Sequence, residues 1–159
     1  LHVRSRRQRQ MCIRDRVHPE RLISEPECLS RPLYGFENTE HTINNEGPYA
    51  FYYHNKIYLA YSGGDARGYL YAIGMLTAND GDDLCDLSVW EKAKTPIASF
   101  ATIPGEYGPG HNSFFWDRDQ NLWIAYHAVT SFEEKIVSSG MRRVYFEQDK
   151  TPRFDVIVE

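Results

Sequence analysis

Residues 49–61 decide the fold, and they read Tyr-Ala-Phe-Tyr-Tyr-His-Asn-Lys-Ile-Tyr-Leu-Ala-Tyr. Aromatic and aliphatic residues fill both ends of this stretch, and the polar run His54-Asn55-Lys56 separates them. Aromatic and β-branched residues favour strands, and two such runs joined by a short polar turn are typical of a β-hairpin. The stretch therefore predicts one strand from Tyr49 to His54 and a second from Ile57 to Tyr61.

The same pattern returns 65 positions later, where Ala60-Tyr61 recurs as Ala125-Tyr126. A polar turn at residues 117–121 again separates two apolar runs, residues 114–117 and residues 122–126. Repeats longer than about 40 residues, each with about four short strands, suggest the blades of a β-propeller. Because a propeller needs at least ~4 blades, two repeats predict either part of a propeller or a sandwich of two similar sheets.

Further strands are expected outside the two hairpins, at residues 69–77 and 93–99 in the first repeat and at 141–147 and 154–158 in the second. We place the repeats at about residues 46–100 and 108–159. Both lie within a domain that we expect to span residues 17–159.

Residues 1–16 differ from the rest of the chain in charge. They hold six arginines and one aspartate, a net charge of +5, so the remainder of a chain of net charge −4 carries −9. A segment this basic, without apolar periodicity, is not typical of a folded domain or of a secretory signal. The string Met-Cys-Ile-Arg-Asp-Arg at 11–16 resembles translated sequencing-adapter read-through, and a natural basic tail is the alternative. We expect residues 1–16 to be a non-native or disordered basic segment.

Composition limits the partners of the protein. A net charge of −4 argues against a nucleic acid held by general electrostatics. No apolar run approaches the ~18–20 residues of a membrane helix, so no membrane partner is expected. The cysteines Cys12, Cys28 and Cys85 allow one disulfide at most and do not fix the compartment, so localisation stays open.

Glu46 and His111 stand at equivalent places, each just ahead of the first hairpin strand of a repeat and 65 positions apart. Gly47-Pro48 follows the first, and Gly108-Pro109-Gly110 precedes the second. Taken singly, they are most simply a solvated loop glutamate and a core histidine. In a propeller the inner strands run along the central channel, so the repeat favours a shared functional pocket. His127, at a strand end of the second repeat, is interpreted as structural.

Four segments together resemble glycoside hydrolase family 43: Asn45-Glu46-Gly47-Pro48, Ile57-Tyr58-Leu59-Ala60-Tyr61-Ser62, Tyr107-Gly108-Pro109-Gly110-His111-Asn112-Ser113-Phe114 and Ile124-Ala125-Tyr126-His127-Ala128. The resemblance runs from about residue 22 to the end. It implies an all-β fold, part of a five-bladed β-propeller, with about two blades and the end of a preceding one. It also implies inverting hydrolysis of arabinofuranosides or xylosides of plant polysaccharides.

By the same resemblance, Glu46 would be the general acid, at the mouth of the fourth blade. His111 would lie at the fifth blade on the channel axis, where some members hold a calcium ion or a water, and no other cofactor is expected. Asn45 and Tyr107 would line the channel. The aspartate base of the family has no match here, because too little sequence precedes Glu46. We therefore expect the chain to be a C-terminal fragment that is inactive alone.

Two other hypotheses stay open, a non-catalytic carbohydrate-binding propeller or lectin-like module and a plain structural β-domain. Inverting hydrolysis needs a protonated acid and a carboxylate base ~6.5–9.5 Å apart, with the attacking water between base and sugar. A binding module needs neither group. The expected partner of the enzyme and of the binding module alike is an oligo- or polysaccharide.

Overall fold

The computed structural model describes residues 27–131, 133 and 136–156, together with the backbone of residues 11–13, 16–18 and 21–22. The described residues form strands, turns and two short 3-10 helices, η1 (Gly35–Glu37) and η2 (Leu87–Val89). Neither of these helices has the length or the apolar composition to cross a membrane. The prediction for residues 1–16 falls mostly outside the described residues.

The first sheet has four antiparallel strands in chain order: β7 (Asn45–Tyr53), β8 (Lys56–Gly63), β9 (Ala72–Asn79) and β10 (Glu91–Lys92). Tyr53 pairs with Lys56 across the first turn, where His54 and Asn55 have φ angles of 45° and 62°. Two residues of positive φ form the type I′ turn whose twist matches that of a hairpin. The predicted hairpin is confirmed.

The second sheet has three antiparallel strands: β11 (Tyr107–Trp116), β12 (Leu122–Val129) and β13 (Val137–Arg143). Asp117 closes the turn between the first two strands. Its carboxylate accepts hydrogen bonds from the Asn121 side chain at 2.9 Å and from the Trp123 indole at 2.8 Å. These hydrogen bonds lower the pKa of Asp117 to about 2, and the bond from Asn121 has the largest effect.

Short two-stranded ladders flank the two sheets: β1 (Met11–Ile13) with β4 (Glu27–Ser30), β2 (Arg16–His18) with β3 (Arg21–Leu22), β5 (Asn38–Thr39) with β6 (Thr42–Ile43), and β14 (Tyr145–Phe146) with β15 (Pro152–Arg153).

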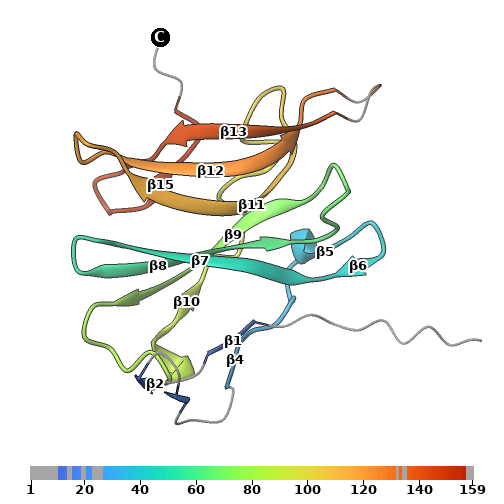
Figure 1. The fold of residues 1–159 in the computed structure, drawn as a ribbon. Coiled ribbons are helices and arrows are strands. Elements are labelled where there is room, and N and C mark those ends of the chain that lie inside the picture. Colours follow the sequence, from blue (N-terminus) through green and yellow to red (C-terminus); the bar gives the residue numbers. More distant parts are fainter. Residues whose placement is uncertain are drawn as a thin grey trace, which may run out of the picture.

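The two sheets pack face to face, with β11 lying against the first sheet (Figure 1). Phe51 on β7 and Phe114 on β11 meet at 4.5 Å between ring centroids, and both are buried. Around them lie apolar residues of both sheets, including Tyr58, Ile73 and Ile124. Burial of this shared core joins the two repeats into one unit.

The opposite face of the first sheet packs on the segment that precedes it. Tyr61 and Leu76 form a second buried cluster, against which Leu29 and Phe36 pack. Leu29 on β4 and Phe36 on η1 therefore cover part of the face of the first sheet that points away from the second, with β4 drawn below that sheet in Figure 1.

Several strand predictions were wrong in extent. The strand predicted at 69–77 is β9, Ala72–Asn79, and the first hairpin strand begins at Asn45 rather than at Tyr49. Only Glu91–Lys92 forms an outer strand, and residues 93–99 add one bridge, Ile73 to Ala98. Pro96 interrupts the ladder there because proline lacks the N–H that a strand must donate. The strand predicted at 141–147 is divided between β13 and β14. The strand predicted at 154–158 was wrong for the residues that the structure describes: β15 is Pro152–Arg153, residues 154–156 are not in a strand, and residues 157–159 lie outside the described part.

Candidate active site

The first strand of each sheet, β7 or β11, is irregular at the end where Glu46 or His111 lies. In β7 the pairing with β8 shifts between Glu46 and Tyr49. Gly47, inside this shift, has a φ of 57°, which glycine adopts without steric cost. In β11 the pairing shifts on both sides of Gly110. Bulges of this kind bend a strand and re-aim its side chains, and they are frequent next to active sites.

Glu46 is half-buried and is held by a tyrosine from the same sheet. The Tyr71 hydroxyl donates a hydrogen bond to Glu46 Oε1 at 2.9 Å. Tyr71 is fully buried and directly precedes β9. The carboxylate is therefore oriented by a rigid group rather than by solvent.

Gly110 makes this contact possible. A Cβ on Gly110 would overlap the ring of Tyr71. Because Gly110 of the second repeat has no side chain, Tyr71 has the space it needs to hold the carboxylate of Glu46.

His111 lies beside the β7 entrance. Its backbone N–H donates to Ser62 Oγ at 2.8 Å, and Ser62 is the cross-strand partner of Glu46. A Cβ on Gly47 would stand 3.7 Å from His111 Nδ1, so the imidazole lies next to the residue that follows Glu46. The predicted meeting of the two entrances is present in the structure.

His127 joins the same group. Its ring stacks on Tyr71 at 5.7 Å and 11° and on His111 at 6.2 Å and 20°. Burial lowers the pKa of His127, the charge of His111 lowers it further, and the charge of Glu46 acts in the opposite direction. The sequence interpretation of His127 as structural overlooked this position. A signal was available, because His127 stands 65 positions after Ser62, the partner of Glu46.

Asn45 and Tyr107 occupy different surroundings. Asn45 is 2% exposed, and its Nδ2 donates to Ser30 Oγ at 2.9 Å, which ties the start of β7 to β4. The ring of Tyr107 meets that of Tyr69 edge to face at 6.0 Å. That these two residues line a channel stays a prediction.

A hollow of about 460 Å³ opens next to His127. Arg67 and Tyr69 of the first repeat line it, together with Glu40 from the segment before that repeat and Val129 and Val137 of the second. It offers both charged and apolar surface at the end of the sheets where Glu46 lies.

The residues around His111 are a poor match for the calcium ion that the family resemblance implies. Calcium takes 6–8 oxygen ligands, whereas the nearest side chains here include two imidazoles. Among the described residues, no group of three or more His, Cys, Asp or Glu side chains is placed to hold a metal. The calcium expectation stays a prediction.

Two blade-like sheets bring one carboxylate and two imidazoles to a common end. The family model of glycosyl hydrolases family 43 matches residues 13–152, and the chain belongs to that family.

Similar proteins agree with this assignment. The chain is 38% identical over 101 residues, 63% of its length, to an extracellular exo-α-(1→5)-L-arabinofuranosidase of Streptomyces chartreusis, and covers 30% of that protein. It is 29% identical over 150 residues, 89% of its length, to the protein of the same name from Streptomyces avermitilis, and covers 31% of it. The chain thus spans about a third of these curated relatives.

The structure also resembles the crystal structure of α-L-arabinofuranosidase from Lactobacillus brevis, with a TM-score of 0.80 and 28% identity. This match covers 91% of the present chain and 46% of the other. The fold is therefore all-β and is part of a five-bladed β-propeller, as the resemblance implied. The boundaries of the two repeats stay a prediction.

Proposed function

We propose that this chain forms part of a glycoside hydrolase that releases arabinofuranosyl or xylosyl units from plant polysaccharides with inversion, and that Glu46 is its general acid. The observation that carries the proposal is the position of Glu46. It stands at the bulged entrance of β7, is oriented by the Tyr71 hydroxyl at 2.9 Å, and lies at the end of the sheets that also bears His111 and His127.

The reaction assigns one proton transfer to this chain. Glu46 gives its proton to the glycosidic oxygen as the bond between that oxygen and the anomeric carbon breaks. A water attacks the same carbon from the opposite face and loses a proton to a carboxylate base. In the proposal this base is an aspartate from outside these 159 residues. The hydrogen bond from Tyr71 remains available to the carboxylate after the proton has left, so it stabilises the charge that develops.

The hollow beside His127 is the proposed place for the leaving sugar. A general acid must reach the oxygen of the leaving group, so that group lies on the Glu46 side of the broken bond. Tyr69 offers a ring face and Arg67 a hydrogen-bond donor in this hollow, both of which suit a sugar. The similarity to exo-α-(1→5)-L-arabinofuranosidases favours an arabinofuranosyl unit as the one removed.

The test follows the product anomer by NMR during the first minutes of hydrolysis by the full-length protein that contains this chain. We expect the anomer opposite to that of the substrate, and a loss of roughly 10²–10⁴-fold in rate for Glu46→Gln. Glu147→Gln, an exposed glutamate in a surface ion pair with Arg153, is the matched control and should keep full activity. A retained anomer, or an active Glu46→Gln variant, would contradict the proposal.

Two further outcomes separate the alternatives. A full-length protein that binds arabino-oligosaccharides without turnover would favour the carbohydrate-binding module. The 159-residue chain alone should show no turnover, because in the proposal the base is missing from it. Turnover by the chain alone that Glu46→Gln abolishes would contradict that part of the proposal.

A further inference from the structure

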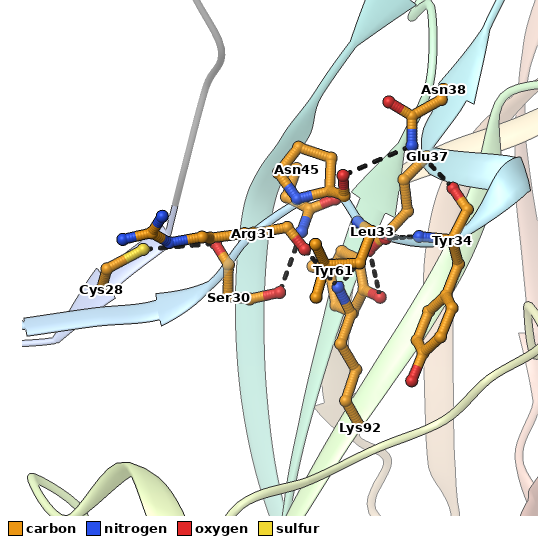
Figure 2. A network of polar contacts seen from close by, with 11 residues as sticks. Cys28, Ser30, Arg31, Leu33, Tyr34, Glu37, Asn38, Asn45, Tyr61 and Lys92 are labelled. Carbon is orange, nitrogen blue, oxygen red and sulfur yellow. Dashed lines mark hydrogen bonds and ion pairs between the residues drawn. The ribbon is translucent and has the colours of Figure 1, made fainter.

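Glu37, in the segment that precedes the first sheet, is a fully buried carboxylate with four partners (Figure 2). Its Oε2 accepts hydrogen bonds from the backbone N–H groups of Leu33 at 2.7 Å and Tyr34 at 2.8 Å. Its Oε1 accepts one from the Tyr61 hydroxyl at 2.8 Å and lies 2.5 Å from Lys92 Nζ. A buried charge is tolerated only when it is paired and bonded in this way.

Lys92 reaches this site from β10, at the far edge of the sheet. Its ammonium also donates to the backbone carbonyl of Arg31 at 2.7 Å. It stands over the rings of Tyr34 and Tyr61, 5.2 Å and 5.3 Å from their centroids. The cation is thus held by a carboxylate, a carbonyl and two aromatic faces.

The second sheet contains the same combination of groups. Tyr126 donates to Glu106 Oε2 at 2.6 Å, and Arg142 Nη2 donates to Glu106 Oε1 at 2.7 Å. Arg142 Nε donates to the Tyr126 hydroxyl at 2.7 Å, which closes the triangle. About a fifth of the Glu106 and Arg142 side chains is exposed.

The tyrosines of the two clusters occupy equivalent places in the repeat. Tyr61 and Tyr126 are 65 positions apart, the same offset as the two site entrances. Each tyrosine has a glycine as its cross-strand partner, Gly74 and Gly140 respectively. A Cβ on Gly74 would overlap the Tyr61 ring, and one on Gly140 would stand 3.0 Å from Tyr126 Cζ. In both sheets the third strand therefore makes room for the tyrosine of the second.

The cation differs between the clusters, whereas the carboxylate and the tyrosine do not. Lys92 comes from the fourth strand of its sheet, and Arg142 comes from the third. Because the positive charge is supplied from two different places, the shared feature is a glutamate bonded to the tyrosine of the second strand.

Each glutamate is joined to the entrance that bears a site residue. The carbonyl of Glu37 accepts a hydrogen bond from Asn44 N–H at 3.1 Å, and the Asn44 carbonyl accepts one from Gly64 N–H at 3.3 Å. Asn44 is the second residue before Glu46. Glu106 immediately precedes β11, the strand that carries His111.

We propose that Glu37 and Glu106 are corresponding positioning residues, one in the segment that leads into each repeat. Each ties the segment entering a sheet to the second strand of that sheet, and so fixes the entrance at which Glu46 or His111 stands. The catalytic consequence of this inference rests on the proposed function, whereas its geometric consequence does not.

The geometric test is NMR on the chain, with Tyr61→Phe and Tyr126→Phe as variants that each remove a single oxygen atom. We expect Tyr126→Phe and Glu106→Gln to shift the imidazole signals of His111 and His127. Tyr61→Phe and Glu37→Gln should shift the side-chain carboxyl signal of Glu46. Glu147→Gln, in a surface pair, should leave all three unchanged. Lowered thermal stability with unchanged signals would mean that the clusters are structural only, and would overturn the inference.

The catalytic test compares the full-length Glu37→Gln variant with Ile73→Val, a core variant chosen to lose thermal stability without touching the cluster. We expect kcat to fall more than tenfold in Glu37→Gln, with KM within about twofold, and kcat to be retained in Ile73→Val. Equal kcat values in the two variants would overturn the inference. If Glu46→Gln is fully active, the proposed function fails instead, and the NMR shifts still decide the positioning role.

Discussion

At Gly110 the absence of a side chain decides which group can reach the carboxylate of Glu46. Tyr71 crosses the space above this glycine, bonds Glu46 through its hydroxyl and stacks on His127 with its ring. One residue of the second repeat therefore controls the surroundings of a residue in the first. This coupling would be invisible in either repeat alone.

Gly110→Ala should therefore displace Tyr71 and release Glu46. Overpacking of a buried site costs roughly 1–3 kcal/mol, and we expect a loss of stability in that range together with a lower kcat. The measurements are urea unfolding and steady-state kinetics of the full-length protein. Gly35→Ala is the control, because nothing lies within 4 Å of a Cβ placed there. Equal stability and equal kcat in the two variants would contradict the role given to Gly110.

The lowered pKa of His127 predicts that the stability of the protein depends on pH. Burial lowers its pKa in the folded state below the ordinary value of 6.5, so the unfolded chain takes up a proton first as the pH falls. Stability should then rise with pH through the interval just below 6.5 and level off above it. His127→Gln should flatten this slope in unfolding measurements across the interval.

His54→Asn provides the control for that experiment. His54 is exposed in the hairpin turn at a φ of 45°, a conformation that asparagine accepts readily. The slope should persist in this variant. If the His127→Gln variant keeps the slope, the pH dependence of stability arises from another group.

At the scale of the elements, alternation and turn chemistry explain why the hairpins could be predicted. His54 and Asn55 suit a two-residue turn, and aromatic runs on either side fill both strands. The strand starts could not be predicted in the same way. Gly47-Pro48 and Gly108-Pro109 indicate breaks when only sequence is considered, whereas the structure includes both pairs in bulged strands.

The candidate site was predictable only in part, for a related reason. The repeat offset indicated that Glu46 and His111 meet, because equivalent strand ends lie side by side in stacked blades. Tyr71 and Gly110 could not be found this way, since their contact depends on how one sheet sits on the other. The same applies to the Glu37 and Glu106 clusters, whose cations come from non-equivalent strands.

Phe114 and Phe115 on β11 offer a matched test of how the sheets are joined. Phe114 is 5% exposed and packs on Phe51, whereas Phe115 is 43% exposed. Phe114→Ala should cost about 3–5 kcal/mol of stability, because it leaves a cavity between the sheets. Phe115→Ala should cost much less. Urea unfolding of both variants compares them, and similar losses would contradict the packing described.

At the scale of the whole molecule, the first sheet is held on both faces. One face shares an aromatic core with the second sheet, and the other packs on residues 27–37, fixed by the buried Glu37 and Lys92 pair. This stacking brings the bulged ends of β7 and β11 together. The site is thus a product of how the blades stack rather than of one loop.

Glu46 as the proton donor is the central claim, and the dependence of the rate on the leaving group tests it most directly. A dinitrophenyl group departs as an anion without help, whereas an alkyl or sugar group must be protonated as it leaves. In the full-length protein, Glu46→Gln should lose roughly 10²–10⁴-fold in kcat/KM on an arabino-oligosaccharide and far less on the dinitrophenyl arabinofuranoside. Equal losses on the two substrates would contradict the assignment of Glu46 as general acid.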